Sequence, residues 1–246
     1  MPLPDIIHVH IPRTAGTALK QFLARCGYRI LDLDFITNLF PEADVARWRD
    51  GRAEQPFLFT GHLRLGHAVV REAAGRAAII TVLRDPRERL LSNYNFSRCR
   101  PDAIWHEELV TGRMSFLDHV RETLALYGPQ YAYFDPAGDG DWRWTGTATA
   151  HECLNHINDS VTAFGFVERL PEFIDLLRER LDLPAAPLRA ENSVESFTPP
   201  DGVAIKTALT ADERTALTGL LRDDIWFYEQ ARSLYTQQLA ARTSAR

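Results

Sequence analysis

The feature that most constrains the fold is an apolar run near the start of the chain that passes through a turn into a helix. Its residues are His8-Val9-His10-Ile11-Pro12-Arg13-Thr14-Ala15-Gly16-Thr17-Ala18-Leu19. A strand that ends in a tight turn before a helix directs backbone N–H groups and the positive end of the helix dipole at one point. Arg13, Thr14 and Thr17 add charge and hydroxyl groups there. The segment predicts a phosphate-binding loop; an ordinary corner with Arg13 in solvent is the alternative.

The loop differs from that of nucleoside-triphosphate-binding proteins. Their sequence is G-x-x-x-x-G-K-[ST], with a lysine directly before the hydroxyl residue that holds magnesium. Here Gly16 directly precedes Thr17, and the cationic residue, Arg13, comes early in the turn. The loop therefore does not require a metal-bound triphosphate as its ligand.

A second segment has the same strand-to-helix character. The continuous apolar run from residue 77 to residue 83 is typical of a strand buried on both faces. It is followed by Arg84-Asp85-Pro86-Arg87-Glu88-Arg89-Leu90-Leu91-Ser92-Asn93-Tyr94. Pro86 suits the first turn of a helix, so Arg84 falls at the end of the strand and Ser92 inside the helix. A guanidinium and a hydroxyl so placed can hold one phosphate monoester.

Together the two segments resemble those of the sulfotransferases that use 3′-phosphoadenosine 5′-phosphosulfate (PAPS), especially the branch of the heparan and chondroitin sulfate O-sulfotransferases. In that family an H-x-P-K-T-x-G/S-T loop binds the 5′-phosphosulfate, and a strand ending in R-D-P-x-E-R-x-x-S-x-Y binds the 3′-phosphate. Residues 10 to 19 match the first element and residues 84 to 94 match the second. The resemblance implies an α/β fold of sulfotransferase type in a soluble, bacterial-type member. Such a fold has a P-loop NTPase-like central parallel sheet flanked by helices.

The resemblance also implies an activity. A PAPS-dependent O-sulfotransferase moves the sulfuryl group to a hydroxyl of a sugar or small molecule, without a metal, and leaves adenosine 3′,5′-bisphosphate (PAP). By position, the 5′-phosphosulfate would contact Arg13, Thr14, Ala15, Gly16, Thr17 and Ala18, and the 3′-phosphate would contact Arg84 and Ser92. A later polar loop resembles the family's N-x-S loop near the nucleotide and adds Arg189, Asn192 and Ser193. For that loop a surface turn is an equal alternative.

A histidine after a third predicted strand is the expected general base. Gly61-His62 follows the apolar run that begins at Phe57, and the related glycosaminoglycan 2-O-sulfotransferases carry a G-H in the same interval that supplies their base. Neutral imidazole suits proton abstraction from a hydroxyl near pH 7. The alternative for His62 is a hydrogen bond to a neighbouring loop, with the base supplied instead by His67, His106 or Glu107.

Arg13 departs from the family, whose loop nearly always has lysine there. That lysine donates to the oxygen that bridges sulfur and phosphorus; arginine supplies charge but cannot shuttle a proton. We expect Arg13 to be competent because the other elements of the motifs are intact. Two alternatives stay open: a metal-dependent nucleotide or small-molecule kinase, which needs lysine next to Thr17, and a non-catalytic nucleotide-binding protein.

Composition fits one enzyme domain. With 246 residues, 45 % of them hydrophobic, the chain can form a single domain over residues 1–246, with a frayed tail after Ala240. It has no run of about eighteen apolar residues and no signal-peptide pattern, so we expect a cytoplasmic protein without a membrane partner. A net charge of −5 argues against nucleic acid as a partner. Cys26, Cys99 and Cys153 show no ligand spacing, so reduced thiols are expected. The oligomeric state stays open.

The remaining sequence alternates predicted strands and helices. Strands are expected at residues 6–11, 28–32, from 57, 77–83 and 163–167, and helices at 16–26, 43–49, 68–74, from 86, 147–158, 170–181, 209–221 and 223–239. This order predicts a parallel sheet with a ligand at the carboxyl ends of its strands. The less regular middle is expected to build the acceptor side, with core packing as the alternative for its aromatic residues Tyr131, Tyr133, Phe134, Trp142 and Trp144.

Overall fold

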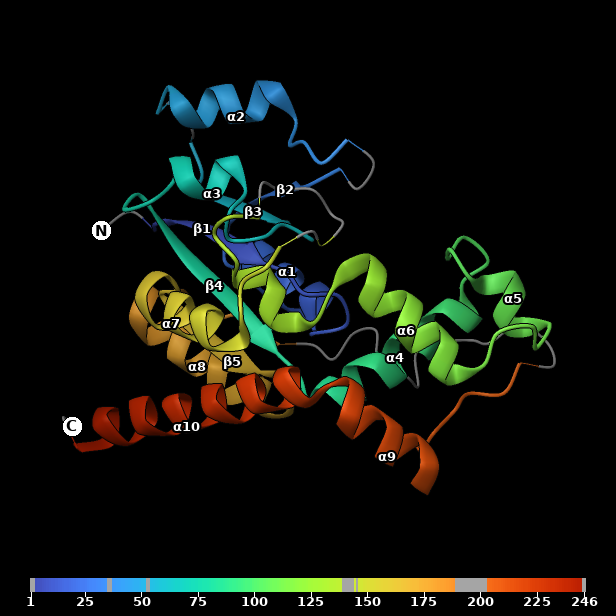
Figure 1. The fold of residues 1–246 in the computed structure, drawn as a ribbon. Helices are drawn as coiled ribbons and strands as arrows, with labels where there is room; N and C mark the ends of the chain where they lie inside the picture. Colours follow the sequence, from blue (N-terminus) through green and yellow to red (C-terminus); the bar gives the residue numbers. More distant parts are fainter. Residues whose placement is uncertain are drawn as a thin grey trace.

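A five-stranded parallel sheet forms the centre of the molecule (Figure 1). The computed structural model describes residues 3–34, 37–51, 54–138, 144, 146–188 and 203–244. The strands are β1 (Asp5–Val9), β2 (Arg29–Asp32), β3 (Phe57–Gly61), β4 (Ala77–Leu83) and β5 (Ala163–Phe166). They lie in the order β2-β3-β1-β4-β5, and every neighbouring pair is parallel. The predicted α/β fold with a parallel sheet is therefore confirmed.

Helices cover the sheet on both faces. They are α1 (Gly16–Arg25), α2 (Glu42–Arg49), α3 (Ala68–Glu72), α4 (Pro86–Cys99), α5 (His106–Val110), α6 (Phe116–Tyr127), α7 (Ala150–Ser160), α8 (Leu170–Leu181), α9 (Ala211–Leu220) and α10 (Arg222–Ser244), with short 3-10 helices η1 (Gln130–Phe134) and η2 (Val167–Arg169). Figure 1 shows α2 and α3 beyond the β2–β3 edge and the long α10 on the opposite side, near α7 and α8. None of the described helices has the length and apolarity needed to cross a membrane.

The central strands are apolar on both faces, as a sheet covered by helices requires. Ile6, Ile7 and Val9 of β1 are fully buried. One polar pair lies among them: His8 Nδ1 is 3.0 Å from Oγ1 of Thr60, its register partner on β3. A buried polar group without a hydrogen bond is costly, so each of these two side chains stabilises the other in the core.

One element differs from the sequence prediction. The middle of the chain contains the regular helix α6, which begins with a capping box between Ser115 and Asp118 and packs Phe116 and Val120 against α4 and α9. The S-x-x-D spacing before an apolar run is the signal for this helix. At the other end, α10 ends at Ser244, and the fraying expected after Ala240 stays a prediction. The three cysteines are buried free thiols, as expected.

A close contact under β5 gives a first prediction. A Cβ atom on residue 165 would lie 2.2 Å from Cγ of Phe173, a fully buried residue of α8. Gly165→Ala should therefore lower the free energy of unfolding, measured by urea denaturation, by about 1–3 kcal/mol. Gly219→Ala in α9 is the matched control, since no atom lies within 4 Å of its added Cβ. Equal stability of the two variants would contradict this packing.

Candidate functional site

Three predicted site segments follow three adjacent strands. The loop with Arg13 follows β1, His62 follows β3 directly, and Arg84 follows β4 directly. Because β1 lies between β3 and β4 in a parallel sheet, the carboxyl ends of all three strands lie at the same edge. Ligands of open α/β sheets bind at this edge, at the point where the order of the strands along the sheet reverses.

The loop after β1 has an unusual backbone. Arg13 and Ala15 have φ angles of 70° and 60°, in the left-handed region that residues with a Cβ atom rarely adopt. Each such residue costs about 1–3 kcal/mol and persists only where the surrounding structure holds it in this conformation. One contact that holds the loop lies within it: the hydroxyl of Thr14 donates to the carbonyl oxygen of Ile11 at 2.8 Å. The loop is therefore a tight, strained turn.

The same contact bears on the prediction for the Thr14 side chain. The hydroxyl of Thr14 was expected to face a phosphate, but the Thr14 side chain is fully buried and its hydrogen is given to Ile11. The reason is the left-handed backbone on both sides of Thr14, which turns its side chain inward. The part of Thr14 still available for an anion-binding role is its backbone.

The helix that follows the loop begins without a side-chain cap. The N-cap residue of α1 is Ala15, and its first turn contains no acidic residue. In contrast, Asp85, Ser115 and Thr149 cap helices α4, α6 and α7 with side-chain oxygens. The first N–H groups of a helix need acceptors, and an anion meets this need and also complements the helix dipole. The start of α1 is thus suited to a phosphate or sulfate group.

The loop and the start of α4 lie in direct contact, although they are distant in sequence. Nε of Arg13 donates to Oγ of Ser92 at 3.2 Å, and Nη1 of Arg84 donates to the carbonyl oxygen of Arg13 at 3.2 Å. The guanidinium carbon of Arg13 also lies 4.6 Å from the ring centroid of Phe96. The structure therefore brings together the two arginines and the serine of the two motifs.

The two arginines share a partly buried environment. Burial and the positive charge of Arg84 lower the pKa of Arg13 to about 10, and burial also lowers the pKa of Arg84. Both side chains are protonated at pH 7. The pKa of Arg13 is still well above neutrality, and a guanidinium group such as that of Arg84 keeps its proton in proteins. Two like charges that act on each other raise the free energy of the folded protein, and a bound anion would lower it.

Three histidine rings lie close together beside this loop: those of His8 and His10 are stacked, and that of His62 is tilted against His10. The ring centroid of His10 lies 5.1 Å from that of His8 and 5.2 Å from that of His62. A Cβ atom on residue 16 would lie only 2.0 Å from Nε2 of His10, so glycine is required where α1 begins. His10 is therefore packed between the first residue of α1 and the expected base, His62.

The histidines are neutral at pH 7. Burial lowers the pKa of His8 to about 3, with a smaller contribution from His62. The pKa of His62 falls to about 4, mainly by burial and further by the charge of Arg13, and burial is also the main reason why the pKa of His10 is well below its ordinary value. A neutral imidazole can accept a proton, which is the property that a general base requires.

The three alternative bases form other interactions. His67 caps α3 by accepting from the N–H of Val69 at 3.2 Å, and His106 Nδ1 lies 3.0 Å from the carbonyl oxygen of Ser97. Glu107 of α5 forms an ion pair with Arg113 at 2.8 Å, and Figure 1 shows α5 far from strands β1 and β3. Of the four expected bases, His62 is the one next to Arg13.

Several predicted residues have other surroundings. Tyr133 and Phe134 are buried in the core and do not form an acceptor wall, because η1 turns both rings inward. Tyr131 and Trp144 instead line an open hollow of about 400 Å³ with Trp226. Residues outside the described part of the chain are Arg189, Asn192, Ser193 and Trp142.

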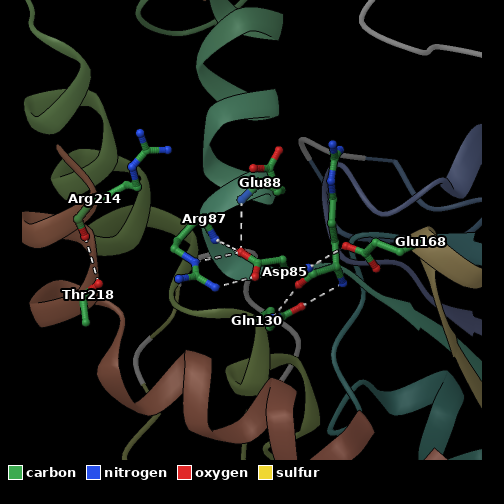
Figure 2. A network of polar contacts seen from close by, with 8 residues as sticks. Asp85, Arg87, Glu88, Gln130, Glu168, Arg214 and Thr218 are labelled. Carbon is green, nitrogen blue, oxygen red and sulfur yellow. Dashed lines mark hydrogen bonds and ion pairs between the residues drawn. The ribbon is translucent and has the colours of Figure 1, made fainter. Parts of the chain in front are cut away.

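A polar network at the start of α4 includes Gln130 and Glu168, which lie outside the two predicted phosphate-binding segments. Figure 2 shows Gln130 and Glu168 reaching the residues around Asp85. Nε2 of Gln130 donates to the Arg84 carbonyl at 3.0 Å, and the N–H of Arg84 donates to Oε1 of Gln130 at 3.4 Å. The N–H of Asp85 donates to Glu168 at 3.0 Å, while its carboxylate caps the helix. The sequence does not indicate this contact, because it joins two residues that are far apart in the chain.

The buried histidines predict a dependence of stability on pH. Below the ordinary pKa of 6.5, unfolded His8 takes up a proton that the folded protein excludes until about pH 3, so the free energy of unfolding falls as the pH falls through this window. Each such histidine contributes a slope of about 1.4 kcal/mol per pH unit. In urea denaturation between pH 6 and 4.5, His8→Gln should reduce the slope by about this amount.

The control for this measurement is His151→Gln, on the exposed face of α7. It should leave the slope as it is in the parent protein. An unchanged slope in His8→Gln would show that His8 titrates normally in the folded state.

Comparison with known proteins addresses the fold. No protein-family model and no curated protein matches the sequence. Among solved structures, mouse sulfotransferase SULT7A1 complexed with PAP is similar with a TM-score of 0.57 and 12% identity, over 95% of this chain and 88% of that chain. Two structures of retinol dehydratase, one with androsterone and inactive cofactor PAP and one with retinol and PAP, are 15% and 16% identical with TM-scores of 0.42, over 76% of this chain and 62% of theirs. The likeness to the mouse enzyme establishes that this chain has the sulfotransferase fold.

Proposed function

We propose that the protein is a PAPS-dependent O-sulfotransferase. The observation that supports this most is the contact of Arg13 with Ser92 and of Arg84 with the Arg13 carbonyl. It sets two anion-binding points side by side: the uncapped start of α1 and the arginine at the end of β4. A nucleotide with phosphate groups at both its 5′ and 3′ positions needs two such points. The fold-level neighbour SULT7A1 is complexed with PAP, which is this kind of nucleotide.

The residues present fit the donor. The N–H groups of residues 14–18, together with Arg13 and Thr17, would hold the 5′-phosphosulfate, because α1 begins without a carboxylate that would repel it. Arg84 and Ser92 would hold the 3′-phosphate, and binding there would reduce the repulsion between the two arginines. Arg189, Asn192 and Ser193 are further proposed contacts.

The proposed chemistry divides the work between the arginine and the histidine. PAPS supplies the sulfuryl group, and the acceptor is a hydroxyl of a sugar or small molecule. A ring nitrogen of His62 accepts the proton of that hydroxyl. Arg13 stabilises the negative charge that develops on the departing phosphate, without giving up a proton. An anion that offsets the charge of Arg13 would remove the smaller of the two causes that lower the pKa of His62, burial being the larger, and would make His62 a somewhat better base.

A second candidate follows from Arg13 itself. Arginine in place of the family's lysine favours a protein that binds the nucleotide without turnover, because an arginine cannot protonate the leaving oxygen. A metal-dependent kinase is less well supported, since Gly16 stands where the kinase loop has its lysine. Measurements of ligand selectivity and of turnover separate the three functions.

Calorimetric titration of PAP, adenosine 5′-phosphate and ATP without metal tests the donor site. PAP should bind selectively, and Arg84→Ala should weaken its binding by a factor of about 10 to 100, as expected for a lost charge-assisted hydrogen bond. Arg121→Ala, an exposed arginine on α6, is the control and should bind PAP like the parent. Tighter binding of ATP with magnesium, or no binding of PAP, would overturn the proposed function.

The role of His62 is tested on turnover. His62→Ala should keep nearly the parent affinity for PAP and lower turnover with a competent hydroxyl acceptor by a factor of about a hundred or more. The measurement is transfer of labelled sulfate at saturating donor. Equal losses of PAP binding in Arg84→Ala and His62→Ala would contradict the division of roles.

A further inference from the structure

We propose that Gln130 is a positioning residue for the donor site: its amide fixes the backbone of Arg84 and so directs the Arg84 guanidinium at the 3′-phosphate. This inference rests on the proposed function, because it assumes that Arg84 binds that phosphate. Gln130 belongs to η1, far from Arg84 in sequence.

The geometry at Arg84 is a two-point attachment. The side chain of Gln130 donates to the Arg84 carbonyl at 3.0 Å and accepts from the Arg84 N–H at 3.4 Å, and it is fully buried. An amide can make both bonds at once because it carries a donor and an acceptor. Strand pairing of β4 ends at Leu83, whose register partner is Phe166. Gln130 therefore forms hydrogen bonds with the backbone of the first residue beyond β4, where the described strand pairing has ended.

Gln130 is itself held by a buried carboxylate. Oδ2 of Asp224, on α10, accepts from the N–H of Gln130 at 3.1 Å, and Oδ1 accepts from the N–H of Tyr131 at 3.2 Å. Arg89 of α4 lies 3.8 Å from the same carboxylate, and both side chains are almost completely buried. The network thus runs from Arg84 through Gln130 and Asp224 to Arg89. Arg89 lies near the start of α4, the helix that follows Arg84.

The segment that carries Gln130 also contacts the loop of the expected base. Arg64, two residues after His62, donates to the carbonyl oxygens of Ala132 and Tyr127 at 3.0 and 2.8 Å. The N–H of Leu65 donates to the carbonyl of Tyr133 at 2.8 Å. Because η1 is bonded on both sides, a change at Gln130 acts on the Arg84 side while the contacts on the His62 side remain. The expected defect is therefore in donor binding, not in proton transfer.

The test is the selectivity of Gln130→Met, which keeps the length of the side chain and removes both bonds to Arg84. The ratio of the affinities for PAP and adenosine 5′-phosphate, measured by calorimetry on the full chain, should fall at least about tenfold. Affinity for adenosine 5′-phosphate should stay within about threefold of the parent, since the start of α1 is unchanged. Turnover at saturating donor should be kept while the KM for the donor rises.

Asn95→Leu is the matched control. Asn95 is a buried amide on α4 that attaches to the backbone of Lys206 in the same two-point manner, at 2.8 and 2.9 Å. Its loss should lower the unfolding temperature, as the loss of Gln130 does, but leave the selectivity ratio unchanged. Similar changes of the ratio in both variants, or none in Gln130→Met, would overturn the inference.

Failure of the inference and failure of the proposed function give different results. If the parent protein shows no preference for PAP, the proposed function is wrong and the inference falls with it. If the parent prefers PAP, Arg84→Ala loses the preference and Gln130→Met keeps it, the inference alone is wrong. If Gln130→Met does not fold, Gln130→Asn is measured in its place: it keeps the amide but shortens the side chain, and the ratio should fall in the same direction.

Discussion

The hydrogen bond from Arg84 to the carbonyl oxygen of Arg13 holds the loop after β1 against the start of α4. Two residues of that loop are in the left-handed region, at a cost of about 1–3 kcal/mol each. A hydrogen bond from a charged donor contributes about 1.5–3 kcal/mol, so this bond and that of Thr14 to Ile11 together are of the size needed to offset the strain. The same bond brings two positive charges together, which opposes it. The loop is therefore stabilised by its own contacts and, in the proposed function, further by a bound anion.

Burial leaves the arginines of the site charged and its histidines neutral at pH 7. It acts in the same direction on arginine and histidine, since it disfavours the cationic form of both. The outcome differs because arginine starts far above pH 7 and histidine starts just below it: Arg13 keeps its charge at a pKa of about 10, while His62 loses its charge at about 4. His10, against the positive end of α1, is further disfavoured as a cation by the helix dipole. One environment thus yields an anion-binding arginine beside a neutral imidazole.

The sequence predicted the sheet and the meeting of the two motifs well, because both depend on features that residue types reveal. Buried parallel strands are continuous apolar runs, and Pro86 after Arg84 marks the start of a helix. Side-chain direction was less accessible. The inward side chain of Thr14 depends on left-handed backbone at Arg13 and Ala15, neither of which is a glycine. The burial of Tyr133 and Phe134 depends on packing against distant helices, and the role of Gln130 depends on a contact with a residue far away in the chain.

The buried pair of Arg89 and Asp224 connects this last point with stability. Taking two charges out of water costs several kcal/mol for each ion, and a separation of 3.8 Å returns only part of that cost. Apolar side chains of similar volume would stabilise such a position at least as well. They would not present a carboxylate to the N–H groups of both Gln130 and Tyr131. Gln130 would then lose the hydrogen bond that holds its backbone in the position from which its side chain binds Arg84. The pair is thus better explained by the position it gives to Arg84 than by the stability it adds to the fold.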